Sequence, residues 1–184
     1  LAPAITGSGS ITSWELNNTN LPTGISFGST NGTLYGTATQ LWTRTSYTVW
    51  ANNSGGSVVA YFNLTVNDQI PTLSYSPNTL VLTKGNQSSD LPLNATLTGS
   101  GAITSWAISP ALPSGLSFGT SNGTIWGTPI SLMTLKTFTI WANNSGGSSS
   151  ATVNITVNDE APDISYSPDW FVLTNNTAMS PTAT

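Results

Sequence analysis

Apolar and polar side chains alternate with a period of two along most of the chain, and no stretch keeps the spacing of an amphipathic helix. Within residues 72–162 this alternation predicts short strands separated by turn residues such as Asn-Gly and Ser-Gly-Gly. The predicted strands lie at about residues 79–84, 92–98, 102–109, 115–118, 123–127, 135–144 and 149–158. Seven short strands in about 91 residues are typical of an antiparallel β-sandwich.

The alternation also separates an inward face from an outward face. The predicted inward side chains are Trp106, Ile108, Phe138, Ile140, Ala142, Val153, Ile155 and Val157, with Trp14, Leu16, Tyr47, Val49 and Ala51 as counterparts nearer the N-terminus. Each fully buried side chain of this size contributes roughly 1.5–3 kcal/mol. A module with about a dozen of them can fold without disulfides, and the chain contains no cysteine.

The chain contains two copies of one repeat. The run VWANNSGGS at residues 49–57 returns almost unchanged at residues 140–148, and LPTGISF at residues 21–27 returns as LPSGLSF at residues 112–118, both after 91 residues. The runs SYSP and VLT of the complete module, at residues 74–77 and 81–83, return once, at residues 165–168 and 172–174. Such self-similarity identifies a tandem array of one structural unit.

The repeat boundaries predict three segments. Residues 72–162 form a complete module, residues 1–71 a module that lacks its first strand, and residues 163–184 the first-strand segment of a further module, here called the tail. We expect the tail of one subunit to complete the first module of the next by strand addition, which gives a head-to-tail polymer. The alternative is that residues 1–184 are a window of one long covalent array.

The pattern of motifs resembles a known family. Each module carries Leu-Pro-x-Gly-Leu/Ile-Ser-Phe, Asn-Gly-Thr-Ile/Leu-x-Gly-Thr, an aromatic-Thr-Val/Ile strand, a Ser-Gly-Gly turn and a final Val/Ile-rich strand. This resembles the immunoglobulin-like repeat domains of bacterial and archaeal surface proteins, which are related to cadherin-like and dystroglycan-type modules. The resemblance implies tandem all-β sandwiches that serve as spacers, stalks or adhesins and carry no catalytic residues. The composition is also similar to that of archaeal cell-surface proteins.

Composition narrows the function further. Only 5% of the residues are charged, histidine is absent, and Ser, Thr and Asn together make up about 40% of the chain. Without His or Cys the chain lacks the common bases, thiol nucleophiles and zinc ligands, and no carboxylate pair is placed for catalysis. Three cationic residues and a net charge of −4 argue against nucleic-acid binding. No apolar run approaches the ~18 residues of a membrane span. We therefore expect neither an enzyme nor a cofactor.

Acidic residues at the module junctions are weak candidates for Ca²⁺ ligands. Asn67-Asp68 and Asn158-Asp159 each precede a proline by three residues, as in the junction motif of cadherins, and Glu160 and Asp163 lie near the second junction. Ca²⁺ takes six to eight oxygen ligands, and the first junction offers a single carboxylate. A hydrogen-bonded turn that ends the strand is the favoured interpretation.

Ten Asn-x-Ser/Thr sequons are candidate glycosylation sites. They are Asn17, Asn31, Asn52, Asn63, Asn86, Asn94, Asn122, Asn143, Asn154 and Asn175. The number is nearly twice what composition alone gives. Glycans at some of them would require an extracellular location and would shield a surface with few charges.

Aromatic residues at outward positions suggest contact surfaces. Tyr35 and Trp126 follow inward residues in one strand, and Trp50 and Trp141 do so in another. The candidates are packing at the edge of the sandwich, an interface with another chain, and stacking on sugar rings. In the tail the candidate interface residues are Trp170, Phe171, Val172 and Leu173. A structural extracellular filament, stalk or surface array is the expected function, and an adhesin that binds glycan or protein through Trp and Tyr is the alternative.

Overall fold

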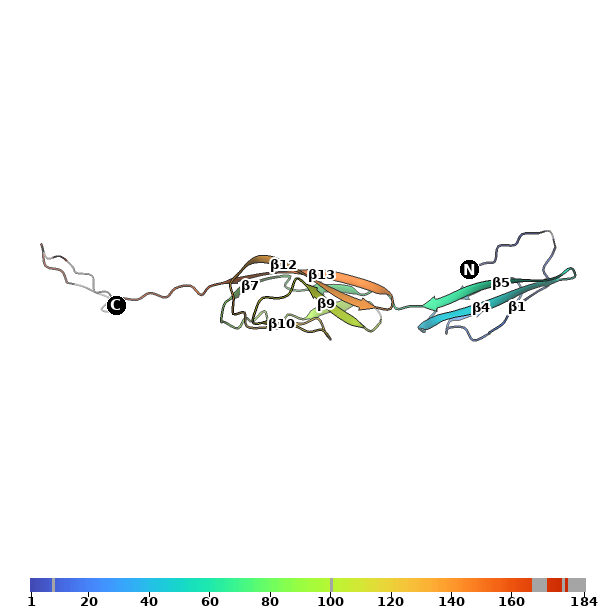
Figure 1. The fold of residues 1–184 in the computed structure, drawn as a ribbon, viewed down its shortest axis with the longest axis horizontal. Helices are drawn as coiled ribbons and strands as arrows, with labels where there is room; N and C mark the ends of the chain where they lie inside the picture. Colours follow the sequence, from blue (N-terminus) through green and yellow to red (C-terminus); the bar gives the residue numbers. More distant parts are fainter. Residues whose placement is uncertain (8, 100, 167–171, 177, 179–184) are drawn as a thin grey trace.

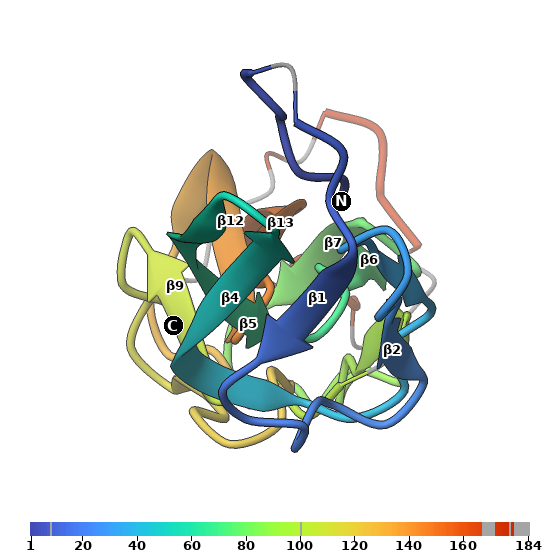
Figure 2. The ribbon, with the colours of Figure 1, turned by 90° about the vertical axis from the view of Figure 1, so that its right-hand side faces the viewer.

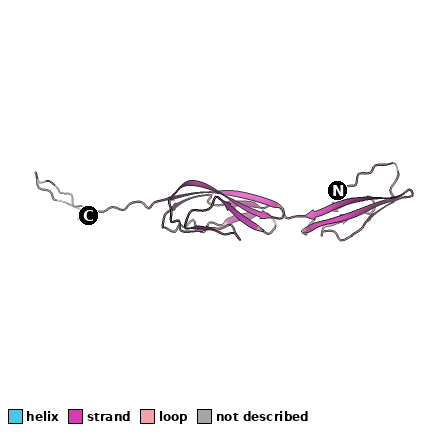
Figure 3. Cartoon of the chain, in the orientation of Figure 1, coloured by secondary structure: helices cyan, strands magenta, loops and turns pink. Residues whose placement is uncertain are grey.

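The computed structural model describes residues 1–184 except 8, 100, 167–171, 177 and 179–184. The described residues form strands and loops without any helix (Figure 3). Residues 13–66 form an N-terminal unit with β1 (Ser13–Leu16), β2 (Ile25–Phe27), β3 (Leu34–Gly36), β4 (Trp42–Asn53) and β5 (Gly56–Val66). Residues 72–158 form a second unit with β6 (Thr72–Tyr75), β7 (Thr79–Thr83), β8 (Ala95–Thr98), β9 (Ser105–Ser109), β10 (Leu116–Phe118), β11 (Ile125–Gly127), β12 (Met133–Asn144) and β13 (Gly147–Asn158). Figure 1 shows the two units in line along the chain.

The second unit is a two-layered sandwich, which confirms the predicted all-β fold. One layer is a sheet with strand order β7-β13-β12-β9. The other layer contains the pairs β6-β8 and β10-β11, which are joined by an antiparallel bridge between Leu93 and Ile125. Fifteen buried residues between the layers form a continuous core. The predicted inward residues Phe138, Ile140, Val153 and Ile155 are all fully buried in it.

Two features of the second unit differ from the predicted strands. β6 was not expected, because the alternating run Thr-Leu-Ser-Tyr is only four residues long and lies between two prolines. β7 pairs with β13 in parallel, whereas the other pairs run antiparallel. The first part of the module therefore contributes one strand to each layer, β6 to one and β7 to the other.

The N-terminal unit repeats this architecture with fewer strands. Its main sheet has the order β1-β4-β5, and β2 pairs with β3 as β10 pairs with β11. The two backbone hydrogen bonds between Leu93 and Ile125 recur between Leu1 and Leu34, at 2.9 Å each. Both long hairpins even contain a register irregularity at the same place, between Trp42 and Thr45 in one and between Met133 and Lys136 in the other.

In each unit, the glycine of the predicted Asn-Gly turn lies against a tryptophan ring. Gly123 has φ = +72°, and a Cβ atom on it would lie 2.4 Å from the ring of Trp106. Gly32 has φ = +68° and lies equally close to Trp14. Glycine is therefore required for both backbone conformation and packing, and the indole of each unit closes one end of the space between its layers.

Candidate functional site

The N-terminal unit contains an open apolar groove of about 770 Å³. Trp14, Val49 and Ala51, from β1 and β4, are buried, and Phe62 from β5 packs partly buried against them. The segment before β1 and Gly32 line the groove from other sides. Figure 2 shows this segment looping away from the strands of the unit. The groove lies between the layers of the sandwich, where a complete module has its core.

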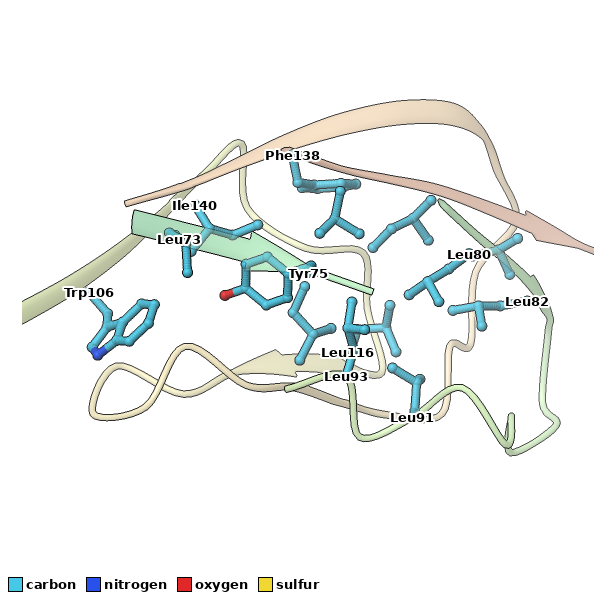
Figure 4. Packing of buried hydrophobic residues seen from close by; sticks show 14 of the residues in the cluster. Leu73, Tyr75, Leu80, Leu82, Leu91, Leu93, Trp106, Leu116, Phe138 and Ile140 are labelled. Atoms are coloured by element: carbon cyan, nitrogen blue, oxygen red, sulfur yellow. The ribbon is translucent and has the colours of Figure 1, made fainter. Parts of the chain in front are cut away.

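In the second unit the corresponding space is filled by side chains from β6 and β7. Leu73 and Tyr75 are 6% exposed, Leu80 is 0% exposed and Leu82 is 1% exposed. Figure 4 shows these side chains among those of the opposite layer. The Tyr75 hydroxyl donates a hydrogen bond of 2.6 Å to the carbonyl oxygen of Gly123, and burial raises the pKa of Tyr75 to about 12. β6 and β7 thus supply four core side chains and one buried hydrogen bond.

Within residues 1–66, residue 8 aside, the structure describes no equivalent of β6 or β7, and two backbone edges of the N-terminal unit have no partner among the described strands. Among the described residues, no strand lies beside the edge of β5 that faces away from β4. Residues 3–6, which correspond to β8, form no strand, whereas β8 pairs with β6 in the second unit. Unpaired strand edges are templates for the addition of another strand.

The missing strands also leave apolar side chains of β5 incompletely covered. Phe62, Leu64 and Val66 are half-buried, whereas their counterparts Val153, Ile155 and Val157 are buried. The nearby side chains of Val58 and Ile5 are 69% and 60% exposed. The unit therefore presents an apolar surface that its own described residues do not cover.

The tail carries apolar side chains that its own chain leaves exposed. Ile164 is 81% exposed, Tyr166 76%, Val172 83% and Leu173 63%. The interface candidates Trp170 and Phe171 lie outside the described residues. The prediction from sequence named Val172 and Leu173 as candidate contacts and did not name Ile164 and Tyr166, although Tyr166 lies in the repeated SYSP run at residues 165–168 and Ile164 directly precedes it.

The outward aromatic residues do not form a single surface. Tyr35 on β3 and Trp126 on β11 are 59% and 43% exposed. Trp50 and Trp141 are half-buried on the main sheets, where Trp50 pairs with Val59 across the strands. Tyr35 and Trp50 therefore belong to different sheets of the same unit, as do Trp126 and Trp141. Each pair is divided between two outer faces, so neither pair makes a broad stacking platform.

The acidic residues near the two junctions lie at opposite ends of the second unit. The Asp68 carboxylate accepts a hydrogen bond of 2.8 Å from Ser145, beside the start of β13. Asp159 follows the end of β13 and forms an ion pair of 3.7 Å with Lys84. Glu160 and Asp163 are exposed beyond it. No group of three or more acidic, His or Cys side chains is placed to hold a metal ion in the part of the chain that the structure describes.

The asparagines of the sequons differ in whether Nδ2 or Oδ1 of the side chain takes part in a hydrogen bond. Asn52 and Asn143 donate hydrogen bonds through Nδ2, Asn52 to Glu15 at 2.9 Å and Asn143 to the Ser105 hydroxyl at 3.0 Å. Six others accept hydrogen bonds through Oδ1 only: Asn17, Asn31, Asn63, Asn94, Asn122 and Asn154. Glycosylation takes place on Nδ2, so this second group presents the reactive atom. Asn86 and Asn175 are exposed.

Comparisons with known proteins agree with this architecture. The model of the Putative Ig domain family (He_PIG) matches residues 2–67 and again residues 71–158. No curated protein sequence matches the chain. No helix of the described residues is long and apolar enough to cross a membrane.

Several solved structures are similar at low identity. A Dscam structure is 16% identical over 79% of this chain and 38% of its own, with a TM-score of 0.38. Human protocadherin-24 EC1-2 is 12% identical over 81% of this chain and 82% of its own, with a TM-score of 0.38. An I-band fragment of titin is 20% identical over 84% of this chain and 57% of its own, with a TM-score of 0.41. The chain thus spans well under half of the Dscam chain that it matches.

Proposed function

Since the chain belongs to the Putative Ig domain family, in which two tandem copies account for nearly all of it, we propose that it is a structural protein of the cell surface whose copies join head to tail. In this proposal, the first part of residues 163–174 of one copy fills the groove of the N-terminal unit of the next copy, and the later part adds to the edge of β5 beside the groove. The contact is an addition of strands from one subunit to the incomplete sandwich of another.

The observation that carries the proposal is the match between the tail and the strands that fill the second unit. At each of the four inward positions of β6 and β7, the tail has a large apolar residue 91 positions later. The pairs are Leu73 with Ile164, Tyr75 with Tyr166, Leu80 with Phe171, and Leu82 with Leu173. The groove and the segment that fits it are therefore present in the same chain.

The expected register follows from the second unit. There, Leu80 pairs with Ile155 and Leu82 with Val157 in the parallel ladder. In the proposed contact, Leu173 takes the place of Leu82 beside Val66 of the next copy. Covering the apolar side chains of both partners contributes roughly 1.5–3 kcal/mol for each side chain that becomes fully buried. The added strand also satisfies the unpaired backbone edge of β5.

One polar contact fixes the orientation of the donated segment. Tyr75 bonds the Gly123 carbonyl at the tip of the Asn-Gly turn, and the equivalent pair is Tyr166 of one copy and Gly32 of the next. Gly32 lines the groove, and Tyr166 is exposed in the single chain. A buried hydroxyl with a single carbonyl acceptor favours one register over a slipped one.

The placement of the two partners favours a polymer over a closed dimer. The tail leaves the second unit at the end of β13, whereas β5 and the groove belong to the N-terminal unit at the other end of the molecule (Figure 1). A contact between two different surfaces propagates when it does not close into a ring. The low charge and the many hydroxyl and amide side chains suit close packing of neighbouring subunits outside the cell.

Deletion of residues 163–184 tests the proposal. We expect the full chain to form filaments visible by electron microscopy and the shortened chain to stay monomeric. The shortened chain should also accept the tail of a full chain and so shorten filaments when the two are mixed. Unchanged filaments from the shortened chain would refute strand donation. The covalent array, in which a preceding repeat of the same polypeptide fills the groove, predicts no filaments from either chain.

A pair of point variants separates donated side chains from general effects on the tail. Leu173→Ser places a hydroxyl at a position whose counterpart Leu82 is buried, so we expect loss of filaments. Val172→Ser changes a position whose counterpart Val81 is 64% exposed, so filaments should persist. Equal assembly of the two variants would contradict the proposed register.

A further inference from the structure

The linker between the two units is held by a defined seat on the second unit. The backbone N–H of Asp68 donates to the Ser145 hydroxyl at 2.9 Å, and that hydroxyl donates back to Asp68 Oδ2 at 2.8 Å. Asn144 Nδ2 donates to the Gln69 carbonyl at 2.7 Å. The seat is thus the turn between β12 and β13, and it binds two consecutive linker residues, Asp68 and Gln69, through main-chain and side-chain atoms.

A glycine makes this close approach feasible. A Cβ atom on Gly146 would lie 2.0 Å from the Asp68 carbonyl oxygen and 2.8 Å from its carbon. Gly101 also lies against the linker, because a Cβ there would be 2.3 Å from the Asp68 carboxylate. Both positions must stay free of side chains for the linker to reach the turn.

The N-terminal unit carries the same seat. The turn Asn53-Ser54-Gly55-Gly56 matches Asn144-Ser145-Gly146-Gly147, and Gly9 corresponds to Gly101. Ser54, Gly55 and Gly56 are all exposed. A Cβ on Gly55 would meet only the side chain of Asn53, at 3.2 Å, among the described atoms. This turn lies at the end of the N-terminal unit that faces away from the second unit (Figure 1).

The chain also carries a second copy of the segment that the seat holds. Asn158-Asp159-Glu160-Ala161-Pro162 repeats the spacing of Asn67-Asp68-Gln69-Ile70-Pro71 and directly precedes the tail. Asp159 is exposed, with Lys84 at 3.7 Å as its ion-pair partner. The segment is therefore accessible, at the end of the molecule opposite the Ser54 turn (Figure 1).

We infer that Asp159 of one copy docks onto the Ser54–Gly55 turn of the next copy and reproduces the joint that connects the two units within a chain. This inference rests on the proposed strand donation and adds the surface that sets the angle between subunits. Every module along the filament would then meet the next through the same set of hydrogen bonds. The joint also places the start of the tail beside the groove that it enters.

A cysteine pair tests the joint, since the chain has no cysteine of its own. Ser54→Cys and Asp159→Cys in one chain, assembled and treated with an added oxidant, should give a ladder of covalent multimers on a non-reducing gel that a reducing agent collapses to monomer. In the in-chain joint the Ser145 hydroxyl contacts both the backbone N–H and the carboxylate of Asp68, at 2.9 and 2.8 Å, so the two residues lie side by side. Asp68→Cys with Ser145→Cys is the matched control and should link within one chain without a ladder.

A second variant tests the joint without cysteine chemistry. Gly55→Ala requires only a small shift of the Asn53 side chain in the single chain, but its methyl group would overlap the docked Asp159 backbone, as a methyl group on Gly146 would overlap Asp68. We expect the concentration needed for assembly to rise roughly tenfold, from the loss of about two hydrogen bonds. Filaments that form without a ladder, and that grow equally well from Gly55→Ala, would overturn the joint and leave strand donation intact. Absence of filaments from the unaltered chain would overturn both.

Discussion

The two units of this chain share one repeat sequence but differ in how completely they bury their cores. The second unit has fifteen buried hydrophobic residues in one cluster, whereas the N-terminal unit has a cluster of three. The difference comes from β6 and β7, which close the second unit and have no described equivalent in the first. The turns, the long hairpins and the bridge between layers are the same in both. A module can therefore keep its framework while an apolar groove takes the place of part of its core, where the described residues provide no equivalents of β6 and β7.

The largest change in the N-terminal unit is expected when equivalents of β6 and β7 are supplied in the same chain. A copy of residues 163–183 fused before Leu1 would stand in the position that residues 72–92 occupy before Leu93. We expect it to fill the groove, abolish filaments and stabilise the N-terminal unit by several kcal/mol, because about four side chains become buried. Calorimetry of the fusion and of the original chain measures the gain. An unchanged first transition together with persisting filaments would show that the groove does not take this segment.

Leu82 in the second unit and Leu173 in the tail occupy equivalent positions of the repeat, and substitution of each should have a different effect. Leu82→Ala should destabilise the second unit by about 2–5 kcal/mol, since it removes a fully buried side chain. Leu173→Ala should leave the unfolding of the single chain nearly unchanged, because Leu173 is 63% exposed there, and should instead weaken assembly. Urea unfolding and sedimentation of each variant separate the two effects. A loss of monomer stability with Leu173→Ala would contradict the comparison.

Tyr75 gives a smaller and pH-dependent effect. Burial raises the pKa of Tyr75 to about 12, so the fold favours the neutral phenol. Its contribution to stability should be complete below pH 10 and should fall as the pH rises from 10 towards 12. Tyr75→Phe should cost about 0.5–1.5 kcal/mol near neutral pH and remove this alkaline loss. Thermal melts of both proteins between pH 8 and 12 test this, and parallel curves would refute it.

The tail tyrosine should matter for assembly and not for the fold of the single chain. Tyr166 is exposed in the single chain and should become buried at the Gly32 carbonyl on assembly. Tyr166→Phe should therefore raise the concentration needed for assembly several-fold, because it removes the hydroxyl that would donate to this carbonyl. Light scattering against protein concentration measures it, and identical curves for the two proteins would remove the Tyr166 hydroxyl from the contact.

Glycan positions should be the same in the two units, with little effect on stability. We expect sugars at the exposed turn residues Asn31 and Asn122, whose Oδ1 atoms are engaged and whose Nδ2 atoms are free. Asn52 and Asn143 should be unmodified, since their Nδ2 atoms donate hydrogen bonds. Glycopeptide mass spectrometry of the native protein reports each site. Sugar on Asn52 or Asn143 would contradict this assignment.

Much of the fold could be predicted because strand periodicity and turn chemistry act locally. The predicted ranges for β9 to β13 overlap the observed strands, and the Asn-Gly turn at Gly123 has the expected left-handed backbone. β6 was not predicted, because an alternating run of only four residues between two prolines is too short to indicate a strand. The parallel pairing of β7 with β13 joins residues more than 70 positions apart, and periodicity does not encode which strands pair.

Only part of the candidate site could be predicted from the sequence. The repeat register pointed to the tail and to the N-terminal unit, because the tail repeats the start of the complete module and the N-terminal unit repeats the rest of it. The groove lining from Gly32 and Val58 depends on the distance between layers, which the sequence pattern does not specify. The hydrogen bond of Tyr75 to a turn carbonyl likewise requires tertiary structure.

The most direct measurement is a side-chain-resolution cryo-electron microscopy map of the native particle. We expect density for residues 163–174 of one copy in the groove of the next and along the edge of its β5, with the Tyr166 hydroxyl at the Gly32 carbonyl and Leu173 beside Val66. An empty groove, or a groove filled by a polypeptide other than the tail of another copy, would contradict the account.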